Sequence, residues 1–131
     1  MNCAARLVCK APKRERSPPP PHLVDLRWLP VERRISYKIA TICYNVITGT
    51  APPYLSDLLE LYTPLRTLRS SADTRIFRIL NGRKRFQGKR AFSFIGPSIW
   101  NNPPFSVRHA QTFSAFKNQL KTHLFSFSYS C

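Results

Sequence analysis

The chain has 131 residues and carries 21 Lys and Arg against 6 Asp and Glu, a formal net charge of +15. This length excludes a large two-domain enzyme, and the charge favours polyanionic partners while saying nothing about the fold. Hydrophobic residues make up 43% of the sequence, enough for a modest core, so the chain is not a fully disordered polyelectrolyte.

The charge is distributed unevenly along the chain. Residues 1–73 contain 11 basic and all 6 acidic residues, whereas residues 74–131 contain 10 basic residues and no acidic one. After Asp73 no carboxylate is present to act as a general base, bind a magnesium ion or neutralise an arginine. The C-terminal half is therefore suited to cationic surface rather than to carboxylate chemistry.

Residues 1–22 are predicted to hold a short helix, within residues 2–10, and a basic, proline-rich linker. Pro18–Pro21 favour an extended polyproline segment, which we interpret as a spacer. A recognition motif for proline-binding domains is the alternative reading of this segment.

Residues 23–64 are predicted to form a helical hairpin. Pro30 opens the first helix and Gly49 ends it as a left-handed cap. The inward face of this first helix is predicted from the helical spacing of its apolar residues. A second helix is predicted to run from Pro52 to Tyr62 with its own apolar face. The residues predicted to face inward from the first helix are Ile35, Ile39, Ile42, Cys43, Val46 and Ile47.

Residues 65–131 are predicted to hold a basic β-hairpin and an amphipathic C-terminal helix. Strands over 75–80 and 83–86 flank Asn81-Gly82, a dipeptide that favours hairpin turns, and a further strand covers 90–95. The last helix begins after Thr112 as N-cap, and the tail from residue 125 is expected to fray. Its apolar stripe is Phe113, Phe116, Leu120 and Leu124, with Lys117 and Lys121 on another face. The predicted fold class is mainly α with a minor β-hairpin (small α+β), with the N-terminal linker and C-terminal tail disordered.

The cysteines and histidines give no metal-binding or disulfide pattern. They are Cys3, Cys9, Cys43, Cys131, His22, His109 and His123. No C-x-x-C pair or zinc-finger spacing occurs, so we expect no metal, no cofactor and reduced thiols, with Cys43 in the core. The N-terminus lacks the apolar run of a signal peptide, and the longest uncharged stretch, residues 39–56, is broken by glycine and proline. We therefore expect an intracellular protein of the nucleus or cytoplasm.

No catalytic constellation is found in the sequence. Asp25, Asp57 and Asp73 stand in three separate segments, so no paired carboxylates hold catalytic metal ions. The sequence contains no P-loop, no G-x-S-x-G elbow and no H-E-x-x-H helix. The prediction is that the chain is not an enzyme.

A basic cluster with aromatic residues is the most informative feature. Clustered Lys and Arg bind phosphates with release of counterions, and exposed aromatic rings stack on bases. The aromatic residues Phe92, Phe94 and Trp100 have two interpretations: they form the core of a small sheet, or they stack on bases. We favour the first. For the charges we favour polyanion contact, because no acidic residue nearby explains them. The predicted nucleic-acid-binding residues are Arg83, Lys84, Arg85, Lys89, Arg90 and Trp100.

The expected partner is RNA or DNA, bound largely independently of sequence, and no small-molecule substrate is expected. The C-terminal helix, with Lys117 and Lys121 opposite its apolar stripe, is also compatible with an anionic membrane. Such an apolar stripe more often packs against the rest of the domain, so we do not expect a membrane partner.

Segments along almost the whole chain also combine into a family pattern. The segments are NCAARLV (2–8), LRWLPV (26–31), APPYLSDLL (51–59), LRSS (68–71), GKRAFS (88–93), FK (116–117) and LKTHLF (120–125). In this order they resemble the region that follows the polymerase core in the polyproteins of LINE-type retrotransposons, which encode a reverse transcriptase.

The resemblance implies a non-catalytic C-terminal region that assists nucleic-acid handling. The metal-binding aspartates of the polymerase and the endonuclease residues of the family are absent here, so neither activity carries over. Two departures from the pattern, Pro18–Pro21 and Pro103, favour an alternative: a translated retroelement remnant, or an interaction peptide with no selected biochemical activity.

Overall fold

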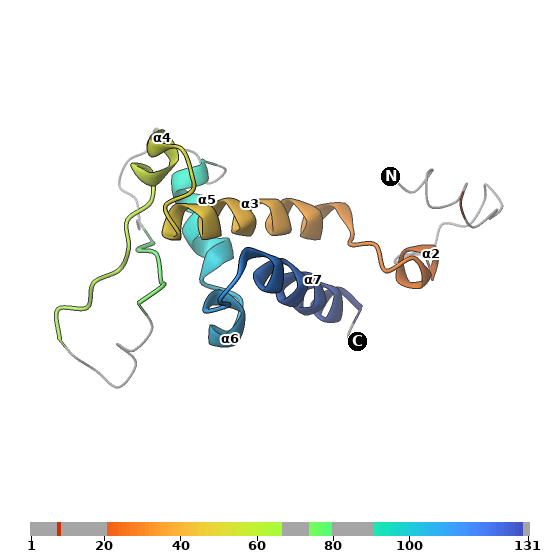
Figure 1. Ribbon diagram of the computed structural model, residues 1–131. Helices are drawn as coiled ribbons and strands as arrows, with labels where there is room; N and C mark the ends of the chain where they lie inside the picture. Colours follow the sequence, from red (N-terminus) through yellow and green to blue (C-terminus); the bar gives the residue numbers. More distant parts are fainter. Residues whose placement is uncertain (1–7, 9–20, 67–73, 80–90, 130–131) are drawn as a thin grey trace.

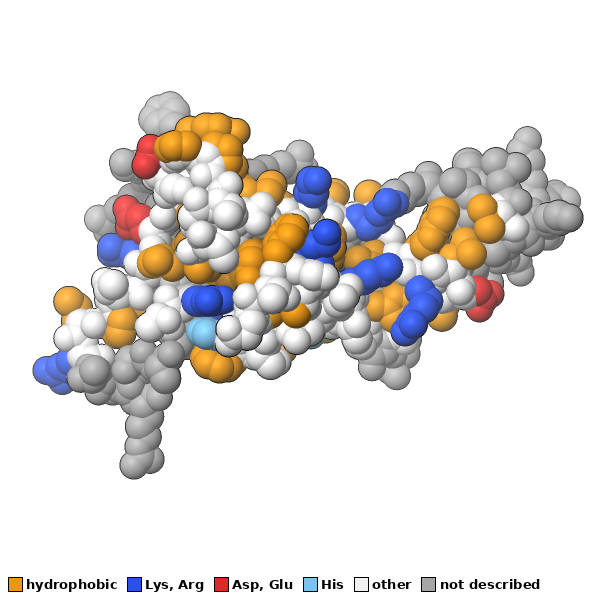
Figure 2. Space-filling view, in the orientation of Figure 1, with side chains coloured by type: hydrophobic (Ala, Val, Ile, Leu, Met, Phe, Trp, Pro, Cys, Tyr) orange, Lys and Arg blue, Asp and Glu red, His pale blue; other side chains and the backbone are white. Residues whose placement is uncertain are grey.

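A computed structural model of the protein describes residues 8, 21–66, 74–79 and 91–129. The described chain is mostly helical, which confirms the main part of the predicted fold class. Its helices are α2 (Pro21–Asp25), α3 (Val31–Ile47), α4 (Pro53–Ser56), α5 (Phe92–Trp100), α6 (Phe105–Arg108) and α7 (Phe113–Tyr129). Figure 1 shows α3 and α7 side by side, with α5 crossing α3 toward the C-terminal end of α3. In the same orientation, Figure 2 shows Lys and Arg side chains along the flank where α3 and α7 lie.

The ends of α3 follow from its terminal residues, as predicted. Pro30 occupies the N-cap position, where its fixed φ and missing N–H cost nothing. Glu32 in the first turn interacts favourably with the helix dipole. Two residues after the helix, Gly49 has φ +74°, a conformation that glycine adopts without steric cost.

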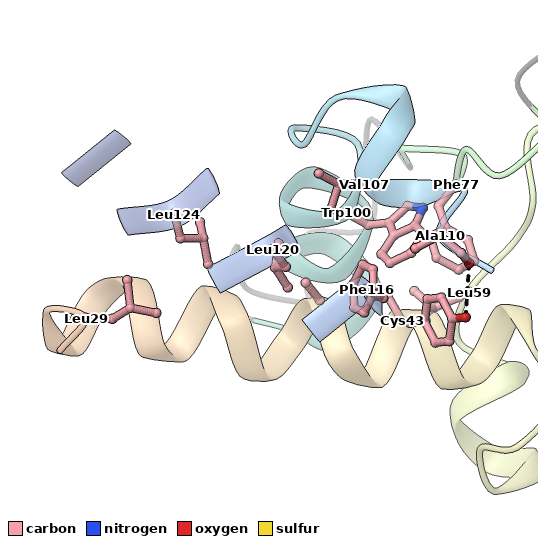
Figure 3. Packing of buried hydrophobic residues seen from close by; sticks show 12 residues of the cluster. Leu29, Cys43, Leu59, Phe77, Trp100, Val107, Ala110, Phe116, Leu120 and Leu124 are labelled. Carbon is pink, nitrogen blue, oxygen red and sulfur yellow. Dashed lines mark hydrogen bonds between the residues drawn. The ribbon is translucent and has the colours of Figure 1, made fainter. Parts of the chain in front are cut away.

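One hydrophobic core joins the central helices. Figure 3 shows Cys43 of α3, Trp100 of α5, and Phe116 and Leu120 of α7 converging in it. The Tyr44 ring stacks on Phe116 with ring centroids 4.5 Å apart, and its hydroxyl donates to the Ala110 carbonyl oxygen at 3.3 Å. The buried cluster comprises Leu29, Ala40, Cys43, Tyr44, Leu59, Phe77, Trp100, Val107, Ala110, Phe116, Leu120 and Leu124.

The inward face of α3 was predicted only in part. Cys43 is fully buried and Ile39 packs against the core, but Ile35 is 53% exposed. Apolar residues occupy most of the circumference of α3, and Ile35 lies on a side of the helix that is not covered by the core. Periodicity alone could not choose between these faces, and packing against α5 and α7 selects the one that carries Ala40, Cys43 and Tyr44.

The predicted second helix of the hairpin is wrong beyond its first turn. The α4 helix ends at Ser56, and the chain is extended at Leu61, which forms an isolated antiparallel bridge with Phe77. Leu59 reaches the core, whereas Tyr54 and Leu61 remain exposed. The partners of α3 are α5 and α7, so the predicted local hairpin is replaced by contacts that are distant in sequence.

The predicted β-hairpin is not seen among the described residues. Residues 74–79 are extended, but their partner is the segment at 60–62: the Tyr62 N–H donates to the Ile76 oxygen, and the Arg78 N–H to the Glu60 oxygen, both at 2.8 Å. The turn at 81–82 and the strand at 83–86 lie outside the described residues. The strand predicted over 90–95 is wrong, since α5 begins at Phe92.

The sequence Gly96-Pro97, predicted to end a strand, lies inside α5 instead. The ring of a proline clashes with the Cβ of the residue before it in a helix, and Gly96 has no Cβ. A Cβ at residue 96 would lie 3.5 Å from the Cys43 sulfur of α3, an ordinary van der Waals distance, and 3.3 Å from the end of the Leu59 side chain, which would have to shift slightly. Burial raises the pKa of the Cys43 thiol to about 12, so this thiol stays protonated and unreactive.

The C-terminal helix begins where predicted and extends further than predicted. The Thr112 hydroxyl accepts from the Ala115 N–H at 3.2 Å, the geometry of an N-cap. Residues 125–129 belong to α7 rather than to a frayed tail, because Phe125 packs against the core and the Tyr129 hydroxyl donates to the Trp28 carbonyl oxygen at 3.0 Å.

The predicted N-terminal helix and linker lie outside the described residues, apart from Val8 and the start of α2. Within the part of the chain that is described, no helix is both long and apolar enough to cross a membrane.

Candidate functional site

The five basic residues predicted to bind nucleic acid, Arg83, Lys84, Arg85, Lys89 and Arg90, lie outside the described residues. The structure therefore says nothing about their arrangement.

Trp100, the sixth predicted site residue, is a core residue. Its side chain is 0% exposed, and its ring contacts Tyr44, Phe77 and Phe116. The indole N–H donates to the Arg75 carbonyl oxygen at 2.7 Å. A base cannot stack on a ring without an exposed face, so the stacking role given to Trp100 is wrong. Trp100 is a core residue, as favoured, but its core is built mainly by helices and not by a small sheet.

A different basic site is formed where the loop before α3, α3 itself and α7 adjoin. A groove of about 640 Å³ opens there, and none of its lining residues is acidic. Its charged residues come from the loop before α3, from α3 itself and from α7. The lining residues are Arg27, Trp28, Leu29, Arg34, Tyr37, Lys38 and Lys121.

The loop side of the groove is shaped by the end of α2. The Trp28 N–H donates to the Leu23 oxygen at 2.8 Å and the Arg27 N–H to the Val24 oxygen at 3.0 Å, the two bonds of a Schellman motif. Arg27 stands at the position that favours glycine, with φ +49°. A non-glycine residue is strained in this conformation, and such residues cluster at functional sites.

Neighbouring contacts hold Trp28 and Arg27 in place. Leu29 is buried in the core cluster, and the Trp28 carbonyl accepts the Tyr129 hydroxyl, which ties the loop to α7. The Arg27 guanidinium lies over the Phe125 ring, 5.9 Å from its centroid. The Trp28 side chain remains 36% exposed and lines the groove.

The helical side of the groove carries cations at regular spacing. Arg34 and Lys38 are four residues apart and therefore share a face of α3, and Lys121 of α7 lines the same groove. Tyr37 lies among them, and desolvation raises the pKa of its hydroxyl. This hydroxyl therefore stays protonated at neutral pH and can donate to an anionic oxygen.

A second, smaller hollow lies between α3 and α7. It has a volume of about 40 Å³ and is lined by Arg33, Ser36 and His123, among others. The Arg33 guanidinium lies over the exposed Phe127 ring, 4.5 Å from its centroid. This hollow can hold a few water molecules but no nucleotide.

The lining of the larger groove is chemically suited to contact anions. It combines four cations with two aromatic residues and contains no carboxylate, cysteine or histidine. Among the described residues no group of three or more His, Cys, Asp or Glu side chains could hold a metal ion.

The sequence analysis missed this groove, although a signal for it was present. Residues 27–38 combine Arg, Lys, Trp and Tyr with a single acidic residue, Glu32. The contribution of Lys121, more than 80 positions away, becomes visible only in the folded chain. No known family model, curated protein or solved structure matches the chain.

Proposed function

We propose that this chain binds RNA or DNA through the sugar–phosphate backbone, largely independently of sequence and without catalysis. The observation that carries the proposal is the groove in which four cations converge with no acidic residue among its lining. Phosphate contacts position a nucleic acid without reading its bases, so binding of this kind is sequence-independent.

The charge of the whole chain supports the same function. A net charge of +15 attracts polyanions at long range, and each phosphate that a Lys or Arg neutralises releases a counterion. The basic cluster at 83–90, predicted from the sequence to contact phosphates, would add to the affinity of the groove.

We further propose that the chain derives from the C-terminal region of a LINE-type retrotransposon polyprotein. The ordered resemblance of its segments supports this origin. We expect the nucleotide sequence upstream of the Met1 codon to encode a polymerase frame, whereas an ordinary promoter and intron structure there would instead favour a domesticated gene.

We expect removal of three groove cations to lower the salt dependence of binding. The variant Arg27→Gly/Lys38→Ala/Lys121→Ala loses three phosphate contacts, so the slope of log affinity against log salt should fall by about 2–3. Glycine is chosen at residue 27 because it relieves the strained φ and keeps the fold intact. Fluorescence anisotropy with a labelled oligonucleotide, titrated at several salt concentrations, measures the slope.

A charge-matched control separates the groove from net charge. Arg66, Arg78 and Lys117 are exposed and lie outside the groove lining. Their triple alanine variant also loses three positive charges, so its net charge equals that of the groove variant. Its slope should stay closer to that of the original chain. Equal slopes for the two triple variants would show that the groove is not the binding site.

A further inference from the structure

The groove contains a feature that phosphate binding alone does not require. Trp28 lines it together with four cations and is 36% exposed, although a side chain of this size gains most from full burial. Trp100 shows the alternative, since it is 0% exposed and its indole N–H is bonded within the core.

We propose that the groove binds single-stranded nucleic acid in preference to duplex, with a base stacked on Trp28. This inference rests on the proposed function and names its substrate class. In a duplex the base faces are covered by their neighbours in the stack, so only a single strand can present one to an aromatic ring. Grooves that combine cations for the backbone with aromatic rings for the bases are typical of single-strand binding.

The backbone of Trp28 is held in place before any ligand arrives. Its N–H is bonded to Leu23, its carbonyl accepts the Tyr129 hydroxyl, and the next residue, Leu29, is anchored in the core. A platform held in this way loses little conformational entropy on binding, which favours affinity. Arg27, the residue before it, has a strained backbone with φ +49°, and its guanidinium lies over the Phe125 ring at the same groove.

The size and charge of the groove fit this ligand. A volume of about 640 Å³ lies within the range of about 300–1,000 Å³ that is usual for sites of drug-sized ligands, a size comparable to a nucleotide. Arg34 and Lys38 on α3 and Lys121 on α7 place positive charge on the helical sides, while Arg27 and Trp28 come from the loop. The phosphates then contact the cations and the base contacts the indole ring.

The test compares strands that differ only in their bases. The full chain is titrated with fluorescein-labelled oligothymidine, with an abasic strand of the same length and charge, and with a duplex hairpin. We expect oligothymidine to bind more tightly than the abasic strand by about 5- to 150-fold, the equivalent of one stacked base, and more tightly than the duplex.

Variants at residue 28 assign the difference to the tryptophan ring. Trp28→Ala should abolish the preference for oligothymidine and leave the affinity for the abasic strand within about twofold, whereas Trp28→Phe should retain most of the preference because phenylalanine also stacks. The abasic strand doubles as a folding control, because an unfolded variant would bind both strands differently from the original chain.

The outcomes separate the inference from the function on which it rests. Equal affinity of the original chain for oligothymidine and the abasic strand, or a preference that survives Trp28→Ala, overturns the single-strand inference alone. Failure of the chain to bind any of the three probes overturns the proposed function as well. Failure to bind these probes, together with binding to vesicles of anionic lipid that is lost in Trp28→Ala, would assign the groove to a membrane surface and overturn both.

Discussion

Trp100→Ala is expected to destabilise the protein by about 3–5 kcal/mol, the usual cost of deleting a fully buried large aromatic side chain. The ring contacts Tyr44, Phe77 and Phe116, so its removal leaves a cavity at the centre of the core. The Arg75 carbonyl oxygen also loses the indole N–H that it accepts at 2.7 Å. Urea unfolding followed by circular dichroism measures the change in the free energy of unfolding.

The second tryptophan provides a matched control. Trp28→Ala removes the same side chain from a position that is 36% exposed, so we expect a much smaller loss of about 1 kcal/mol or less. Trp100→Phe should fall between the two, because it keeps most of the ring volume and loses the hydrogen bond. Equal destabilisation by the two alanine variants would contradict the placement of Trp100 in the core.

The sequence predicted the long helices well because their ends are set by local chemistry. Pro30, Gly49 and Thr112 act on the backbone within a few residues, and their conformations in the structure are those expected of a helix start, a left-handed turn and an N-cap. Local signals of this kind are independent of the rest of the fold.

The secondary-structure predictions are wrong where tertiary contacts, rather than the local sequence, determine the conformation of the chain. The segment after α4 has helical apolar spacing, yet Leu59 is drawn into the core and Leu61 pairs with Phe77. The segment at 92–100 contains Gly96-Pro97, which reads as a helix breaker in isolation. It forms α5 because Gly96, which has no Cβ, permits the proline that follows it to lie inside a helix.

The groove was hidden from sequence reasoning for a related reason. The densest run of positive charge in the sequence lies at 83–90, and the mixture of basic and aromatic residues at 27–38 is a weaker signal. That weaker signal becomes a site only when α7 packs against α3 and adds Lys121 to Arg34 and Lys38. Packing thus brings together in one basic groove the residues Arg34, Lys38 and Lys121, which periodicity assigns only to the exposed faces of two amphipathic helices.

Cys43→Asp should also destabilise the protein strongly, and it tests which face of α3 is buried. The two side chains have similar volumes, so the change adds a charge without overpacking. Cys43 is 0% exposed at the crossing of α3 and α5, where its thiol donates to the Gly96 carbonyl oxygen at 3.7 Å. An unpaired buried carboxylate costs about 3–5 kcal/mol, and urea unfolding at neutral pH measures the loss.

The control is Ile35→Asp, because the sequence pattern placed Ile35 and Cys43 on one inward face whereas the structure separates them. Ile35 is 53% exposed, so a carboxylate there stays hydrated and should cost about 1 kcal/mol or less. Burial raises the pKa of a carboxyl group, so the folded Cys43→Asp protein holds its proton at a pH where the unfolded chain has released it. Its destabilisation is therefore full above the raised folded-state pKa and shrinks as the pH falls from there toward about 4; below about 4 the carboxyl group is protonated in both states and the charge no longer contributes. A loss at Ile35→Asp as large as that at Cys43→Asp would mean that the face of α3 carrying Ile35 is buried as well.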